Sequence, residues 1–299
     1  MATTLTLADK KKKVRTLFGT GVAHGINIAL GEIDEAALDE LLDNGDTARA
    51  KTIEFVTKTA KELSVTNQFA NEEVGSNYTY PNEYRGPLPI REQVKMVAVM
   101  FGLDAEPKIK WLDANPEMTL PSGFGWFAIP RWQKIATTYN EAVEKVLAKL
   151  AESRMFYNNC EGRLGPQYLR QTDRKDQMME KLAEAQGNPD ILIVPAQFGM
   201  KHCGRSVRRA REVMPKKTEF GLGAFEVGIM TLVHPTRFVR WDQLHTDCAG
   251  DEYSPDGDGQ FDGAPIFYFR DGRLEFGSCW AYDGGARVYC GSASGSVPQ

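Results

Sequence analysis

The sequence predicts an α+β fold, in which a helical N-terminal half is followed by a mixed, mostly antiparallel sheet with flanking helices. Three observations favour this class. Apolar residues recur at steps of three and four through most of the first 186 residues. A short β-branched segment, Ile191–Val194, then stands between prolines, as a buried strand does. Finally, the last part of the chain is strand-like and contains a strong hairpin signal at Asp271-Gly272.

Helices are expected through the first half because the apolar periodicity coincides with start and stop signals. Asn44-Gly45 ends the first amphipathic segment, and Thr47 is the expected N-cap of the next. Gly102 closes another helix, and Thr172 or Asp173 caps the last. The expected helical ranges are 33–42, 47–63, 90–101, 131–156 and 172–186. Between 104 and 125 three prolines predict a loop.

The second half mixes strands with short helices. After the strand at Ile191–Val194, residues 206–214 predict a basic helix that ends before Pro215. Residues 220–233 fit either a helix or an alternating strand, and a helix is favoured because fourteen residues are long for a strand. Residues 266–270 and 273–277 are expected to pair as a hairpin around Asp271-Gly272.

Two regions are expected from the organisation of the chain. An N-terminal helical segment spans residues 1–70, and an α+β domain spans residues 84–299. Between them, the polar stretch from Asn71 to Pro89 contains three prolines and is the best candidate linker. At 299 residues, the chain is long enough for one large domain or two small ones.

The overall composition is that of a globular protein, which excludes a largely disordered, collagen-like or coiled-coil class. Lys and Arg number 36 and Asp and Glu 40, so a net charge of −4 gives no global attraction to nucleic acid or membrane. No run of 18 apolar residues is present, and no signal-peptide pattern follows the basic run at Lys10–Lys13. Five scattered cysteines predict reduced thiols. We therefore expect a cytoplasmic protein without a membrane partner.

A cationic block between Lys201 and Lys217 is the first candidate site. It holds seven positive residues and one negative residue. Arg205, Arg208 and Arg209 fall on one helix face, and arginine presents donors that match phosphate oxygens. The glycine-bearing turn before the helix could offer backbone N–H groups to an anion. We expect a phosphate or nucleic-acid site at Lys201, Arg205, Arg208 and Arg209. The alternative is a solvated helix whose arginines pair with the protein's own acids.

An acidic block from Asp242 to Asp262 holds seven carboxylates and no Lys or Arg. Oxygen-rich loops suit Mg²⁺ or Ca²⁺, so a divalent metal is the one cofactor considered. The EF-hand frame fails, because Phe261 stands where that loop requires glycine. Turn chemistry at residues 256–259 is the alternative interpretation. The candidate ligands are Asp247, Asp251, Asp256 and Asp258.

The two blocks could pair with each other inside the fold, since their charges are opposite and nearly equal. If they line one cleft instead, a metal and a phosphate together would suit phosphoester hydrolysis. His245 and Cys248 have the spacing of half a zinc site, which His202 and Cys203 could complete. A Cys/His nucleophilic pair is also conceivable, although buried or incidental residues are the default for all four.

Residues 123–132 gather aromatic and glycine residues beside Arg131. Exposed rings there could stack on bases, but such clusters more often belong to a core. Residues 125–132, 194–209 and 219–235, the last running on to Asp247–Asp251, resemble uncharacterised cytoplasmic proteins of candidate-phylum bacteria over roughly residues 81–299. That resemblance implies a bacterial, cytoplasmic setting and carries no activity, cofactor or catalytic residue.

Two classes of function follow, and a third stays open. The favoured one is a non-catalytic binding protein that takes phosphate-bearing ligands, nucleic acid being the leading example, through the basic helix. The alternative is a metal-assisted phosphoester hydrolase that uses the acidic loop and the same arginines. The third is a structural or assembly subunit, in which the charged blocks form protein–protein contacts.

Overall fold

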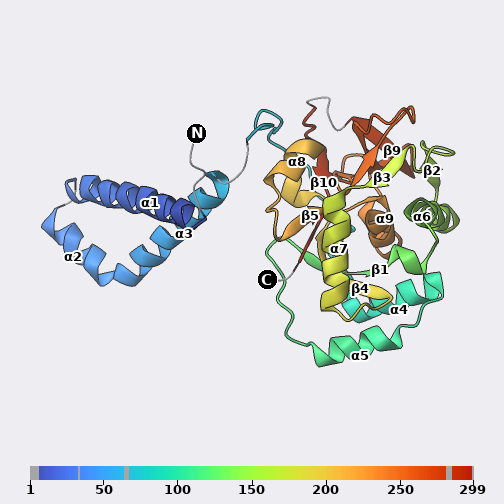
Figure 1. Cartoon of the computed structure of the whole chain (residues 1–299), viewed down its shortest axis with the longest axis horizontal. Coiled ribbons are helices and arrows are strands. Elements are labelled where there is room, and N and C mark those ends of the chain that lie inside the picture. Colours follow the sequence, from blue (N-terminus) through green and yellow to red (C-terminus); the bar gives the residue numbers. More distant parts are fainter. Residues whose placement is uncertain (1–6, 33, 64–66, 281–284, 298–299) are drawn as a thin grey trace. The chain divides into compact units, whose positions relative to one another are not determined.

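A computed structural model of the chain describes residues 7–32, 34–63, 67–280 and 285–297. The chain divides into two compact units, Met1–Thr66 and Asn67–Gln299 (Figure 1). The polar stretch from Asn71 to Pro89 lies within the second unit.

The first unit is helical and has no buried side chain among those that the structure describes. Its helices are α1 (Leu7–Leu30), α2 (Glu35–Asp43) and α3 (Gly45–Leu63). Asp34 caps α2, because its side chain accepts a hydrogen bond of 2.9 Å from the Ala37 N–H. The expected cap at Thr47 was wrong, since α3 begins two residues earlier and Thr47 lies inside it. The first residue of the expected helix, 33, lies outside the described residues.

Six α-helices of the second unit are described. They are α4 (Ile90–Phe101), α5 (Glu106–Ala114), α6 (Tyr139–Ser153), α7 (Asp173–Ala185), α8 (Val207–Val213) and α9 (Ala224–Val233). Two expected signals are confirmed: Gly102 ends α4 with a φ of 67°, and the Thr172 side chain caps α7. The predicted loop at 104–125 was wrong in part, because α5 lies there. Pro107 stands in the first turn of α5, where a missing N–H costs nothing.

The strands form two sheets, so the α+β class is confirmed. The first sheet has the order β1-β4-β11-β5, and all its pairs are antiparallel. Its strands are β1 (Gly125–Pro130), β4 (Ile191–Gln197), β5 (Glu219–Gly221) and β11 (Ser294–Ser296). Strand β4 is buried along its whole length, as its β-branched sequence predicts. Strand β1 carries Phe127 into the core and leaves Trp126 partly buried.

The second sheet has the order β10-β6-β8-β7-β3, with β9 paired to β8 and β2 to β9. Most of its pairs are antiparallel, and β10/β6 and β2/β9 are parallel. Its strands are β2 (Phe156–Asn158), β3 (Leu169–Gln171), β6 (His245–Asp247), β7 (Asp251–Tyr253), β8 (Gly263–Arg270), β9 (Arg273–Trp280) and β10 (Cys290–Ser292).

The hairpin and the helix of the second half are both confirmed. Strands β8 and β9 pair in register up to Arg270 and Arg273, and Asp271 and Gly272 have φ angles of 51° and 77°. Both angles are positive, as a type I′ turn requires. Residues 224–233 form α9, in which every residue is buried. Gly228 permits this packing, because a Cβ there would lie 2.5 Å from the Val146 side chain of α6.

The second sheet presents one face to the core and the other away from it. Phe267 of β8 and Phe276 of β9 are fully buried in the main core cluster. Because side chains alternate along a strand, Tyr268 of β8 and Gly277 and Cys279 of β9 lie on the opposite face. His245 and Asp247 of β6 are offset by one residue from the buried Thr246, so they share that outer face.

Candidate functional site

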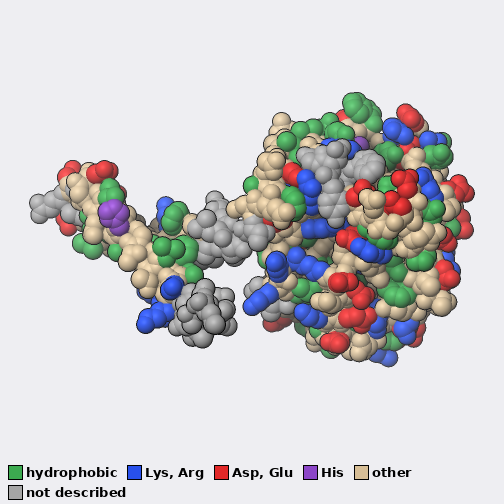
Figure 2. Space-filling model, turned by 45° about the horizontal axis from the view of Figure 1, so that its top comes forward, with side chains coloured by type: hydrophobic (Ala, Val, Ile, Leu, Met, Phe, Trp, Pro, Cys, Tyr) green, Lys and Arg blue, Asp and Glu red, His purple; other side chains and the backbone are tan. Residues whose placement is uncertain are grey.

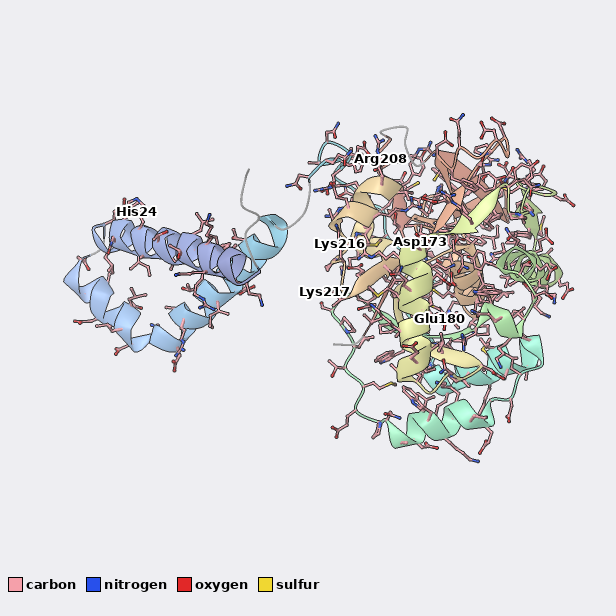
Figure 3. All side chains as sticks on the ribbon, viewed as in Figure 1. His24, Asp173, Glu180, Arg208, Lys216 and Lys217 are labelled. Carbon is pink, nitrogen blue, oxygen red and sulfur yellow. The ribbon has the colours of Figure 1, made fainter. Side chains whose placement is uncertain are left out.

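The basic helix α8 carries its arginines in ion pairs with carboxylates of the same unit. Arg208 is hydrogen-bonded through Nε and Nη2 to Glu72. Arg205 Nε lies 3.2 Å from Glu73 Oε1, and Arg209 pairs with Glu73 and with Glu212, the latter at 2.9 Å. Figure 3 places Arg208 on α8 and Lys216 and Lys217 beyond its end. The three guanidinium groups therefore face Glu72 and Glu73, which precede them by 132–136 positions in the chain.

These ion pairs attach the segment that precedes α4, which contains Glu72 and Glu73, to helix α8. The Ser206 side chain caps α8 and also donates to Glu72 at 2.6 Å. Hydrogen bonding by Arg208 lowers the pKa of Glu72, which keeps this buried carboxylate ionised. Backbone bonds join the same two segments, among them Val74 N–H to Gly204 O at 2.8 Å. The cluster acts as a brace between two parts of the fold.

Lys201, the fourth expected binding residue, is also paired. Its Nζ lies 2.6 Å from Glu219 Oε2, and the other oxygen of Glu219 lies 2.7 Å from His202 Nε2. The charges of this buried network hold the pKa of Glu219 at about 2, against the opposing effect of burial. All four expected cations thus lie close together in the chain and in space, each with a carboxylate partner.

The acidic block does not converge on one point. Asp251 lies in a buried network in which its Oδ1 is 3.2 Å from Lys175 Nζ and its Oδ2 accepts from Tyr139 OH at 2.6 Å. Lys175 also pairs with Glu226 at 2.9 Å, and both side chains are inaccessible to solvent. Because a lysine and two carboxylates satisfy one another there, this network has the character of a structural core element.

The remaining acidic candidates lie elsewhere. Asp256 and Asp258 are exposed, and Asp258 Oδ1 accepts from the Gln260 N–H at 2.9 Å and from Ser254 Oγ at 3.1 Å, which is turn chemistry. Within the described parts of the chain, no group of three or more His, Cys, Asp or Glu side chains could hold a metal ion. The divalent metal at Asp247, Asp251, Asp256 and Asp258 stays a prediction.

Neither cysteine of the predicted zinc half-sites has a metal-like environment. Cys203 Sγ lies 2.9 Å from Ser76 Oγ, and His202 is engaged by Glu219. Cys248 is fully buried, and burial raises the pKa of its thiol well above the ordinary range. A raised thiol pKa keeps the sulfur protonated, which is unfavourable for both a metal ligand and a nucleophile.

Asp247 differs from the other acids because its neighbour Cys279 lines a pocket. The pocket has a volume of about 350 Å³ and opens on the outer face of the second sheet. The described residues that line it are Trp241, His245, Ile266, Tyr268, Phe269, Arg270, Ser278, Cys279, Arg287 and Tyr289. Asp247 is buried behind Cys279, whose Sγ lies 3.4 Å from Asp247 Oδ1. The volume falls in the range of small-molecule sites.

Aromatic rings form much of the pocket wall. The His245 ring centre lies 5.0 Å from that of Tyr289 and 5.6 Å from that of Tyr268. Trp241 is 73% exposed, so its indole is open to solvent at the rim. Such rings offer flat faces to a planar ligand.

Two arginines line the same pocket, and they differ in their partners. Arg270 pairs with Glu275 at 3.0 Å. The Arg287 side chain, in contrast, has no ion pair or hydrogen bond with any residue that the structure describes. Arg287 is half-buried, so its guanidinium is partly withdrawn from water and still lines the cavity. A cation in this state is suited to bind an anion.

The titratable groups of the pocket have unusual affinities for protons. Burial lowers the pKa of His245 to about 4, so the imidazole is neutral near pH 7. Burial also raises the pKa of Asp247 to about 6, an effect that the Cys279 hydrogen bond and the charge of Arg287 offset only in part. Shifted pKa values in a pocket are typical of functional sites. The spacing and charge of the sequence pointed to Asp247 and His245 as metal ligands, but no sequence pattern singled out Cys279, Arg287 or Tyr289.

Comparison of the chain with protein-family models, with curated proteins and with solved structures finds no match. In the described residues, no helix has both the length and the hydropathy needed to cross a membrane.

Proposed function

We propose that this protein binds a phosphate-bearing aromatic ligand, a nucleotide either free or within a nucleic acid strand, in the pocket of the second sheet. This keeps the ligand class that the sequence predicts and moves the site from α8 to Arg287. The observation that carries the proposal is a guanidinium that forms no hydrogen bond or ion pair with a described residue, inside a pocket walled by aromatic rings.

Arg287 supports the phosphate half of the proposal. Guanidinium groups bind phosphate oxygens through paired hydrogen bonds, and such charge-assisted bonds are stronger when the site is partly withdrawn from water. Arg270 adds a second positive charge at the pocket, although Glu275 shares it. The α8 arginines would have to give up Glu72 and Glu73 before they could bind a phosphate, which makes them the weaker candidates.

The rings support the base half of the proposal. Trp241, Tyr268 and Tyr289 offer faces on which a nucleobase can stack, and stacking contributes about 1–3 kcal/mol per base. The neutral His245 ring adds to this wall without competing with Arg287 for the phosphate. A pocket of about 350 Å³ accommodates one nucleotide rather than a duplex.

The protein is proposed to bind rather than to transform this ligand, because the available groups do not form a nucleophile with its base. Burial raises the pKa of the Cys279 thiol well above the ordinary range, so it is protonated near neutral pH. The cytoplasmic setting is likewise a proposal, supported by the five free cysteines in the described chain. The metal-assisted hydrolase stays an alternative that no particular contact favours.

Isothermal titration calorimetry of the full chain tests this proposal. The probes are inorganic phosphate, a mononucleotide and a short single-stranded oligonucleotide, which separate the phosphate, the base and the strand as sources of affinity. Arg287→Gln should weaken mononucleotide binding at least about tenfold. Lys216→Gln is the matched control, since it removes the same charge from an exposed position outside the pocket.

Two results would overturn the proposal. The first is equal affinity of the wild type and Arg287→Gln for every probe that binds. The second is a loss of binding in Arg208→Gln, with native circular dichroism, while Arg287→Gln binds normally. That second outcome would return the site to α8.

A further inference from the structure

We infer that the N-terminal helical unit is a self-association arm, in which the groove between α1 and α3 receives α1 of a second copy of this chain, packed antiparallel. The inference concerns the first unit alone and does not depend on the proposed pocket.

The first observation is that the unit lacks a core of its own. None of its described side chains is buried, and several large apolar residues are at least half exposed. These are Val14, Leu17, Ile26, Ile28, Leu42, Ile53 and Phe55. Helices obtain most of their stability from packing an apolar face, so this unit requires a covering partner.

The second observation is a groove shaped for a helix. It has a volume of about 700 Å³ and lies between α1 and α3, which Figure 1 shows diverging from one another within the unit. Its lining is mainly apolar: Leu17, Phe18, Gly21, Val22, Gly25 and Ile26 from α1, and Lys51, Thr52 and Phe55 from α3.

Glycines mark the groove as a place of close backbone approach. Gly21 and Gly25 are one turn apart on α1, and open space surrounds the position of a Cβ at each. Each glycine disfavours the helix by about 1 kcal/mol relative to alanine. Nothing inside the unit fills the space that their missing side chains leave, whereas a second helix lying across them would.

Charge identifies the partner. Lys10–Lys13 and Arg15 give the start of α1 five positive charges, and no Lys or Arg occurs from residue 16 to residue 48. Seven carboxylates lie between residues 32 and 46: Glu32, Asp34, Glu35, Asp39, Glu40, Asp43 and Asp46. Figure 2 shows the blue and red side chains of this unit at opposite ends.

Two copies of this unit are therefore complementary in charge when they pack antiparallel. Along α1, which is about 36 Å long, the two charged ends are too far apart to neutralise each other in water. An antiparallel second copy brings each basic end to the other's acidic end, and the symmetry satisfies both at once. A parallel copy would place like charges together.

Sedimentation velocity of the full chain, at about 50 and 500 mM NaCl and up to about 100 µM protein, tests the inference. The wild type should dimerise, and more weakly at high salt. Two triple variants should each weaken dimerisation about tenfold or more. One reverses the basic end, Lys11→Glu/Lys12→Glu/Lys13→Glu, and the other reverses the acidic end, Asp39→Lys/Glu40→Lys/Asp43→Lys. Mixed together, the two triple variants should form a heterodimer, because each supplies the charge that the other lacks.

Gly25→Leu tests the groove itself and should abolish the dimer. Ala23→Leu is its matched control, since Ala23 lies on the opposite side of α1 and outside the groove lining, and it should dimerise normally. A wild type that is monomeric under every condition overturns the inference, as does a dimer that strengthens with salt. Cosedimentation of a monomer with phosphatidylglycerol vesicles would also overturn it and assign the apolar face to lipid.

Discussion

The arginines of α8 and Arg287 show two uses of the same side chain within one unit. Arg205, Arg208 and Arg209 come from a densely basic segment, yet each lies against a carboxylate. Arg287 comes from a segment with little charge, yet it lines a pocket, where its charge attracts buried Asp247 but no hydrogen bond or ion pair with a described residue holds it. Local charge density therefore does not indicate which cation is available to a ligand. Availability depends on the carboxylates that the fold brings from elsewhere.

The largest expected effect concerns the brace. Glu72→Gln removes the charge of the buried carboxylate that pairs with Arg208, whose side chain is 23% exposed. We expect a loss of about 3 kcal/mol in the free energy of unfolding, measured with urea. Glu83→Gln is the matched control, because its pair with Arg240 is about half exposed and should contribute much less to stability than the Glu72 pair. Equal effects of the two variants would contradict the brace.

The next effect concerns the acid behind the pocket. Because burial raises the pKa of Asp247 to about 6, the folded state holds this proton more tightly than the unfolded state, and stability from this group is lost as pH rises from about 4 to about 6. Asp247→Asn should therefore be more stable than the wild type at pH 8 by about 3 kcal/mol and nearly equal to it at pH 4. Thermal unfolding across this pH range provides the measurement. A difference independent of pH would refute the assignment.

Replacement of the pocket arginine should weaken ligand binding and leave stability almost unchanged, whereas replacement in the brace should lower stability. Arg287→Gln should change the free energy of unfolding by less than about 0.5 kcal/mol, because it removes no described ion pair. Affinity for a mononucleotide should nevertheless fall at least about tenfold, about 1.4 kcal/mol. Urea unfolding and calorimetry on the same preparation make this comparison. A strongly destabilised variant would show that Arg287 serves the fold, as the α8 arginines do.

The smallest effect concerns the rim. Trp241→Ala removes a ring that is 73% exposed, so stability should be almost unchanged. Affinity for the mononucleotide should fall about fivefold, while affinity for inorganic phosphate should not change. An equal loss for both probes would mean that Trp241 does not stack on a base.

Much of the fold could be predicted from local signals. The Asp271-Gly272 turn, the Thr172 cap and the end of α4 at Gly102 each depend on a few neighbouring residues. The errors are local too: α5 forms because Pro107 falls in its first turn, and Thr47 lies inside α3 because the helix begins earlier.

The site could be predicted only in part, because its residues come from separate strands and loops. His245 and Asp247 attracted attention as possible metal ligands, but their pocket also needs Tyr268, Cys279 and Arg287. Strand alternation offered one signal: Leu274 and Phe276 point to the core, so Cys279 belongs to the other face. No local pattern links Glu72 to Arg208, 136 positions apart in the chain.

Hydrogen exchange of the full chain with and without a saturating dinucleotide tests the central claim most directly. We expect slower exchange in peptides covering residues 241–247 and 285–291, which contain the pocket residues Trp241, His245, Arg287 and Tyr289, and no change in residues 201–214. Protection confined to residues 201–214 would contradict it and identify the α8 arginines as the ligand site.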